Sequence, residues 1–169
     1  LKPVIPTRSS DSEALDSVFE LLCRAGRPAP MVKAMTIPES IAQNKTMSPE
    51  HEALFTYCNA VLEPWDGPAA ICAHDGRWVI AGLDRNGLRP MRFVTTKDGL
   101  LVVGSEAGMV EIPEGDITEK GRLGPGGMIG INLEDGKFYH DREIKTLIAK
   151  RGDFGKWVER TEILDELIK

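Results

Sequence analysis

Hydrophobic residues recur at two different spacings along the chain, and the spacing changes after residue 67. Before that point the apolar positions lie mostly three or four residues apart, as on one face of a helix. From residue 68 to residue 133, short apolar runs are separated by Asp-Gly, Asn-Gly and other glycine-rich turns, which are typical of antiparallel hairpins. Helices followed by a run of strands predict an α+β fold.

Three helices are predicted in the first part of the chain. Ser10 and Glu13 have the spacing of a capping box and begin the first helix, which Gly26 and two following prolines end. Ser48 is a good N-cap for the third helix because Pro49 follows it. The first two helices are expected at residues 10–25 and 31–36, with a polar loop at 41–47. The third is expected from residue 48 until Pro64 and the turn at 66–67 end it. The apolar face of the third is predicted to consist of Leu54, Tyr57, Cys58 and Val61.

The second part of the chain predicts strands and then a helical end. Strands are expected at residues 69–73, 78–83, 92–95, 100–103 and 128–132. The turn at residues 134–136 leads to one more extended segment at 137–140, and a short helix is expected at 142–150. Apolar residues from Trp157 to Ile168 recur at helical spacing, so this tail is amphipathic and needs a partner surface.

Composition narrows the function classes. Hydrophobic residues make up 41% and charged residues 28% of the 169 positions, as in an ordinary globular domain or part of one. The net charge of −5, with dispersed basic residues, argues against nucleic acid as a partner. No apolar stretch is long enough for a membrane span, and no targeting segment is recognisable. We therefore expect a cytoplasmic protein with neither nucleic acid nor membrane as a partner.

Cysteine and histidine spacings predict no metal site. The cysteines lie 35 and 14 residues apart among apolar neighbours, which favours buried thiols in a reducing compartment. The histidines fall in three different elements and are expected at the surface. These residues are Cys23, Cys58, Cys72, His51, His74 and His140. The glycine-rich segment 121–130 lacks the Lys-Ser/Thr and the helix of a phosphate loop, so we predict a turn before the next strand.

A charged corner follows the apolar strand at residues 78–83. Asn86 and Gly87 tolerate positive φ, and a proline at position 90 fixes the exit direction of the chain. Arg85 and Arg89 need acceptors if either is buried, so Asp84 or backbone oxygens are expected to hold at least one of them. On the residues alone, the segment is explained as a structural corner with satisfied ion pairs.

Several segments together resemble a known family. GLDRNGLRP at residues 82–90 is similar to the corner of class II glutamine amidotransferase domains, the N-terminal-nucleophile glutaminases. SDSEALD at 10–16, VVGSEAGMV at 102–110 and GRLGPGGMI at 121–129 agree with that family in the same order. VLEPWDGPAAI at 61–71 and YHDREIK at 139–145 resemble, more narrowly, the large subunits of bacterial glutamate synthases, and the similarity extends from Arg8 to Lys169.

The resemblance implies a fold and a domain organisation. Residues 1–150 would be the C-terminal part of a type 2 glutamine amidotransferase domain, and residues 151–169 an amphipathic tail or a linker to the next domain. The fold would be the later half of an αββα sandwich with mainly antiparallel strands. Glu106 lies in a Ser-Glu corner like that of the family, where it would help to cap the next turn and is a candidate partner for Arg85 or Arg89.

The resemblance also implies which reacting groups to expect. In the family the nucleophile is a cysteine at the mature N-terminus, with its own α-amino group as the base. This chain begins with Leu1, so we expect it to lack the nucleophilic cysteine, to contain no catalytic residue and to be inactive in isolation. Asp11 matches the aspartate that holds the α-amino group of the substrate glutamine. From the residues alone, an ordinary capping residue is the favoured explanation of Asp11, and only the resemblance favours the binding role.

In the intact protein, the resemblance implies that ammonia from glutamine is used for reductive amination of 2-oxoglutarate to glutamate. The implied cofactors are FMN and a 3Fe-4S cluster in other domains of the large subunit, with FAD and NADPH on a small subunit. The implied partners are those domains and that subunit. Two alternatives remain open: a noncatalytic docking module, and a fragment of another class II amidotransferase.

Overall fold

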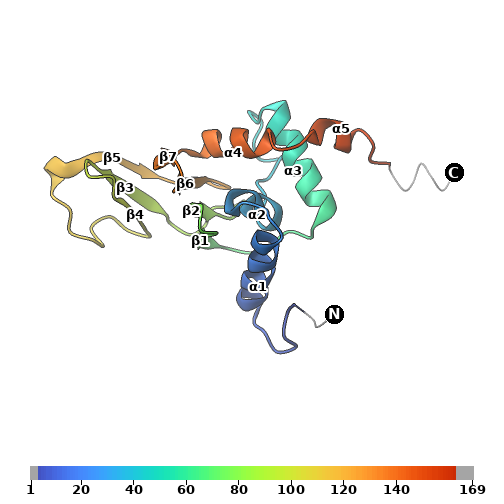
Figure 1. Cartoon of the computed structure of the whole chain (residues 1–169), viewed down its shortest axis with the longest axis horizontal. Helices are drawn as coiled ribbons and strands as arrows, with labels where there is room; N and C mark the ends of the chain where they lie inside the picture. The colour runs from blue at the N-terminus through green and yellow to red at the C-terminus, as the bar shows by residue number, and fades with distance from the viewer. Residues whose placement is uncertain (1–3, 163–169) are drawn as a thin grey trace.

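The computed structural model describes residues 4–162, which form a helical layer and two antiparallel sheets (Figure 1). The helices are α1 (Asp11–Arg24), α2 (Ala29–Thr36), α3 (Pro49–Val61), α4 (Asp141–Ala149) and α5 (Phe154–Val158), with a 3₁₀ turn at Glu114–Asp116. The strands are β1 (Ala70–His74), β2 (Trp78–Leu83), β3 (Arg92–Thr96), β4 (Leu101–Gly104), β5 (Ile117–Arg122), β6 (Met128–Asn132) and β7 (Lys137–Tyr139). The predicted α+β class with antiparallel strands is confirmed.

The helix starts follow local capping chemistry. Glu13 N donates to Ser10 Oγ while Ser10 N donates to the Glu13 carboxylate at 2.7 Å, which completes the predicted capping box. Ser48 caps α3 by accepting a hydrogen bond from His51 N. Helix α2 begins two residues before the predicted start because Pro30 fits within a first helical turn, where its missing N–H costs nothing.

The strands form two separate sheets. Sheet A has the order β1-β2-β6-β7 and sheet B the order β4-β3-β5, and every neighbouring pair is antiparallel. The five predicted strands and the extended segment at 137–140 are present, each within one residue of its expected ends. Strand β5 was not predicted, because its sequence Ile-Thr-Glu-Lys-Gly-Arg lacks alternating apolar residues.

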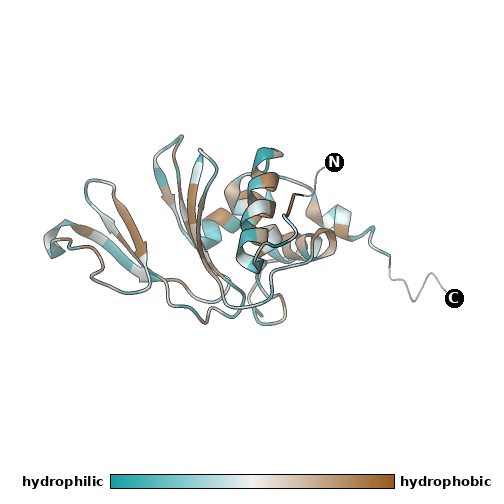
Figure 2. Ribbon diagram, turned by 90° about the horizontal axis from the view of Figure 1, so that it is seen from below, coloured by the Kyte–Doolittle hydropathy of each residue, from teal (hydrophilic) through white to brown (hydrophobic). Residues whose placement is uncertain are grey.

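Sheet A lies between the helices and sheet B, and its side chains alternate between two cores (Figure 2). Trp78 and Ile80 of β2 face the helices and pack with residues such as Leu54 of α3. Ala81 and Leu83, one residue out of phase, contribute with Phe93 of β3 to the core that the two sheets share. The described chain therefore contains three layers in the order helix, sheet, sheet.

Three predictions about side-chain exposure are wrong. Val61, predicted on the apolar face of α3, is 47% exposed. Phe55, which was not predicted on that face, is buried instead. His51 is buried, because it lies on the same face of α3 as Leu54 and Phe55, and its Nε2 contacts Thr146 Oγ1 at 3.1 Å. Cys72 is exposed: it pairs with Ala81 and so lies on the face of sheet A that meets sheet B, but at the edge strand β1 neither core of residues 4–162 includes it.

The chain end contributes one short packed helix. The rings of Phe154 and Trp157 of α5 pack at a tilt against that of Tyr57 of α3, with centroids 5.0 Å and 5.3 Å from it. The remaining part of the predicted amphipathic tail, from residue 163 to residue 168, lies outside the described residues. Within residues 4–162, no helix has the length and apolar character that a membrane crossing requires.

Candidate functional site

Asp84 organises the charged corner from a buried position at the end of β2. Its carboxylate accepts hydrogen bonds from the backbone N–H groups of Ala69 at 2.9 Å, Asn86 at 2.8 Å and Gly87 at 3.2 Å. Burial of the Asp84 carboxyl opposes ionisation, but these three donors more than compensate and hold its pKa below the ordinary value. A charged Asp84 thus ties the start of β1 to the turn after β2.

The two arginines of the corner take other partners. Arg85 pairs with Asp66 at 2.7 Å, and Arg89 Nε donates to the Pro68 carbonyl oxygen at 3.3 Å. The expectation that a backbone oxygen holds one arginine is confirmed, whereas Asp84 as the partner is wrong, because its oxygens are used by backbone N–H groups. Glu106 is exposed and takes part in none of the ion pairs within residues 4–162, so it does not fill the predicted role either.

The glycine-rich turn before β6 is part of the same corner. Gly126 N donates to the Asp84 carbonyl oxygen at 2.7 Å, and Leu83 N donates to the Gly127 carbonyl oxygen at 2.9 Å. Gly87 has a φ of +60°, as predicted, and a Cβ atom there would lie 2.7 Å from Pro125 Cα. The predicted turn therefore also acts as a backbone clamp on the corner.

A buried lysine lies beneath this clamp. Lys33 of α2 is 2% exposed, and its Nζ donates to the Gly126 carbonyl oxygen at 3.3 Å. Burial lowers the pKa of Lys33 to about 7, and the positive charge of Lys145 lowers it further against the opposing effect of nearby carboxylates. Sequence reasoning missed this residue, although a lysine within the otherwise apolar segment Pro-Met-Val-Lys-Ala-Met is a visible signal.

A second buried cation joins the helices to the start of β6. Lys145 Nζ lies 2.6 Å from the Glu39 carboxylate and 2.7 Å from the Asp141 carboxylate, and Asp141 also accepts from Met128 N at 2.8 Å. Burial lowers the pKa of His51, and the positive charge of Lys145 adds to this effect. The spacing of Asp141 and Lys145, four residues apart in α4, was the available sequence signal.

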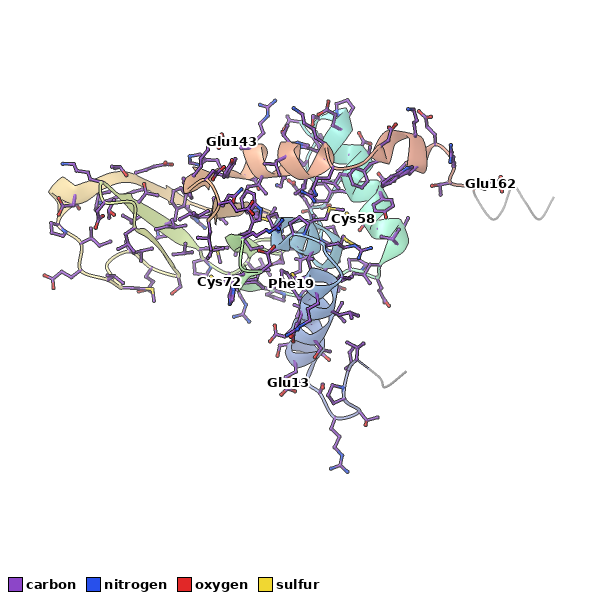
Figure 3. The ribbon with its side chains drawn as sticks, viewed as in Figure 1. Glu13, Phe19, Cys58, Cys72, Glu143 and Glu162 are labelled. Atoms are coloured by element: carbon purple, nitrogen blue, oxygen red, sulfur yellow. The ribbon has the colours of Figure 1, made fainter. Side chains whose placement is uncertain are left out.

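Asp11 occupies a different part of the molecule from the corner. It is the first residue of α1 and is exposed, and the end of α1 that carries the neighbouring Glu13 lies away from the sheets (Figure 3). The helix cap is formed by Ser10 and Glu13. None of the hydrogen bonds or ion pairs of the described residues involves the Asp11 carboxylate, which leaves it available beside the orphan N–H groups of the helix.

The three cysteines do not form a reactive group. Burial raises the pKa of the Cys58 thiol to about 12, and burial followed by the charge of Asp75 raises the pKa of Cys23. Partial desolvation also raises the pKa of Cys72. Since the thiolate is the reactive form, none of these thiols is activated.

Comparison with known proteins assigns the chain to a family. The model of the class II glutamine amidotransferases matches residues 1–157. The chain belongs to the class II glutamine amidotransferases. It is 56% identical over 169 residues, all of its length, to the large chain of the NADPH glutamate synthase of Azospirillum brasilense, of which it covers 11%. The resemblance to the family is confirmed.

Two further relatives show the same pattern. Identity is 45% over 162 residues to the ferredoxin-dependent glutamate synthase 2 of Synechocystis, covering 94% of this chain and 10% of that protein. The chain is also 43% identical over 157 residues to the large chain of the NADPH glutamate synthase of Bacillus subtilis, and this match covers 93% of the chain and 10% of that protein. The chain thus spans about a tenth of the length of the curated relatives it matches.

Proposed function

We propose that this chain is the C-terminal part of the glutaminase domain of a glutamate synthase large subunit. The observation that carries the proposal is the 56% identity over the full 169 residues to one such large chain. In the proposed protein, glutamine is hydrolysed and its ammonia is used for reductive amination of 2-oxoglutarate to glutamate. The three layers of helix, sheet and sheet are those expected for the later part of an αββα sandwich.

The proposed contribution of this chain to the chemistry is substrate binding. Asp11 would accept hydrogen bonds from the α-ammonium group of glutamine, since its carboxylate has no partner among the described residues and stands at a helix start that stabilises negative charge. The nucleophile would be a cysteine outside Cys23, Cys58 and Cys72, whose thiols have raised pKa values. Asp11 is thus a binding residue in this proposal, and the corner around Asp84 is structural.

The implied cofactors would be bound by other parts of the longer polypeptide. A 3Fe-4S cluster needs cysteine thiolates close together, whereas Cys58 is buried in α3 and Cys72 is exposed on the edge strand β1. The glycine-rich turn that precedes β6 is occupied by its contacts with the Asp84 corner, so it does not fit the phosphate of FMN. FAD and NADPH would belong to a small subunit; the names of two relatives contain NADPH and the words large chain. The free thiols suit a cytoplasmic location.

The experiment is an Asp11→Asn substitution in the full-length enzyme, assayed for glutamate formation with glutamine and with free ammonia. Loss of the charged contact should cost about 2 to 4 kcal/mol, or about 30- to 1000-fold in kcat/KM for glutamine. Activity with ammonia should stay near that of the parent. Asp16→Asn, the same charge change at an exposed site in α1, is the matched control. Equal losses with both nitrogen donors would reduce Asp11 to a structural role.

A further inference from the structure

The first turn of α1 is held by reciprocal hydrogen bonds between Ser10 and Glu13. Ser10 N donates to Glu13 Oε2 at 2.7 Å, and the Ser10 hydroxyl donates to the same oxygen at 3.0 Å. Glu13 N donates in return to Ser10 Oγ at 3.4 Å. The bonds from the Ser10 backbone and hydroxyl hold the pKa of Glu13 below its ordinary value, so its carboxylate is charged at neutral pH. Asp11 lies between these two residues.

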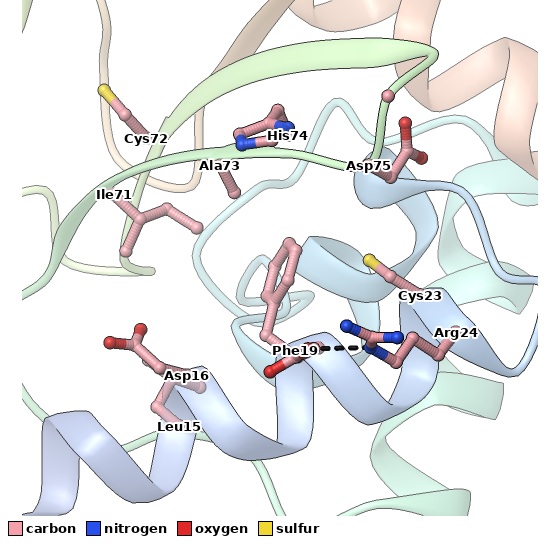
Figure 4. A pocket seen from close by; sticks show the side chains of 12 residues that line it. Leu15, Asp16, Phe19, Cys23, Arg24, Ile71, Cys72, Ala73, His74 and Asp75 are labelled. Carbon is pink, nitrogen blue, oxygen red and sulfur yellow. Dashed lines mark hydrogen bonds and ion pairs between the residues drawn. The ribbon is translucent and has the colours of Figure 1, made fainter.

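Little else within residues 4–162 holds this end of the helix. Phe19 and Cys23, from the later turns of α1, pack against the core between the helices and sheet A, and Phe19 points toward β1 in Figure 4. Of the described residues, none in the first turn joins that core, and Glu13 lies at the end of α1 that is away from the sheets (Figure 3). Residues 4–8, which precede the helix, are exposed. Because uncapped helix ends fray, the geometry of the first turn depends on its cap.

The same bonds determine which carboxylate is free. Asp11 and Glu13 are the acidic residues of the first turn, and both lie beside the unpaired N–H groups of the helix start. Glu13 occupies the Ser10 N–H and hydroxyl, whereas the Asp11 carboxylate accepts none of the hydrogen bonds found within residues 4–162. Without the Glu13 carboxylate, Asp11 would be the acidic side chain left to accept from the freed Ser10 groups. A carboxylate engaged in that way would no longer be available to a ligand.

We propose that Glu13 is a positioning residue for glutamine binding: by occupying Ser10, it keeps the first turn of α1 formed and leaves the Asp11 carboxylate directed at the α-ammonium group of the substrate. This inference rests on the proposed function, in which Asp11 binds that ammonium group. Glu13 acts through Ser10 and Asp11 and does not contact the substrate. The role therefore requires an acceptor oxygen at position 13 and not a negative charge, and a glutamine side chain also completes a capping box.

Kinetics of position-13 variants of the full-length enzyme, with glutamine and with free ammonia as nitrogen donors, test the proposal. Glu13→Ala should lower kcat/KM for glutamine about 3- to 30-fold, the range of a lost helix cap, mainly by raising KM. Glu13→Gln keeps an acceptor oxygen and should restore most of this loss. Activity with ammonia should stay near that of the parent in both variants.

Three results of these kinetics would overturn the proposal. Equal losses for Glu13→Gln and Glu13→Ala would mean that the charge at position 13, and not the cap, is what glutamine binding needs. An unchanged kcat/KM for Glu13→Ala would mean that Asp11 is held without the cap. Equal losses with both nitrogen donors would mean that the cap serves folding alone.

The start of α4 supplies the matched control. His140 N donates to Glu143 Oε2 at 3.0 Å, so Glu143 has the place in α4 that Glu13 has in α1. Glu143→Ala removes a helix cap of the same kind at a different place and should leave the KM for glutamine unchanged. A rise in KM as large as that for Glu13→Ala would show that loss of any helix cap disturbs glutamine binding, and would contradict the proposal.

A double-mutant cycle separates this inference from the proposed function. If Glu13 acts only through Asp11, Glu13→Ala should add less than about twofold to the loss in kcat/KM caused by Asp11→Asn. Losses that multiply would overturn the positioning role and leave the binding role of Asp11 intact. If Asp11→Asn alone leaves kcat/KM for glutamine unchanged, the proposed binding role fails, and this inference fails with it.

Discussion

Substitution of Gly87 by valine should destabilise the protein through two separable effects. Gly87 has a φ of +60°, and a side chain in this conformation costs about 1 to 2 kcal/mol. A Cβ atom would also lie 2.7 Å from Pro125 Cα and 2.9 Å from Pro125 N, both backbone atoms held by the clamp. Such overpacking adds about 1 to 3 kcal/mol. The expected loss in the free energy of unfolding is therefore about 2 to 5 kcal/mol.

Gly136 provides the matched control for this substitution. It has a φ of +65°, but no heavy atom lies within 4 Å of a Cβ built there, so Gly136→Val tests the conformational cost alone. Urea unfolding followed by tryptophan fluorescence should give a loss of about 1 to 2 kcal/mol for Gly136→Val and a larger loss for Gly87→Val. If Gly87→Val does not fold, Gly87→Ala retains the close Cβ contact. Equal unfolding midpoints for Gly87 and Gly136 variants would refute the clamp.

Two further predictions concern the buried lysines. In the folded protein the pKa of Lys33 is about 7, against an ordinary value of 10.5, so between these pH values the unfolded chain binds more protons and stability rises with pH. Lys33→Met should make the free energy of unfolding rise less steeply between pH 7 and pH 10. An unchanged slope would contradict the lowered pKa of Lys33. Lys145→Met should cost about 3 to 5 kcal/mol, because the largely buried carboxylate of Glu39 loses its cation and Asp141 loses its partner in α4, whereas Lys120→Met at the exposed Glu114 pair should cost less than about 1 kcal/mol. Similar losses for these two variants in urea unfolding would contradict a buried network.

Elements with strong local signals could be predicted from the sequence. The capping box of Ser10 and Glu13 marked the start of α1, and apolar runs between glycine turns marked β2 and β6 to the residue. Strand β5 could not be predicted in this way, because its half-buried positions include Glu119 and Gly121. Pairing with β3 stabilises this segment as a strand although its sequence has no alternating apolar pattern.

The site depends on contacts between residues that are distant in sequence. Asp84 or a backbone oxygen was expected to hold an arginine, and the Pro68 carbonyl oxygen does so. Asp84 instead accepts from the backbone N–H of Ala69, fifteen positions away. Lys33 and the Gly126 carbonyl oxygen are 93 positions apart, so only the folded chain brings them together. The proposed role of Asp11 came from the family resemblance, since residue pattern alone left it as a possible cap.

In the proposed function, this chain is part of an enzyme that transfers the amide nitrogen of glutamine to 2-oxoglutarate. The most direct measurement supplies the full-length polypeptide and its small subunit with amide-¹⁵N-glutamine, unlabelled 2-oxoglutarate and NADPH. Mass spectrometry then locates the label in the glutamate formed. The proposed function predicts ¹⁵N in the α-amino group of glutamate newly made from 2-oxoglutarate. Glutamine consumption without label in that glutamate, or label in a different amidated product, would contradict it.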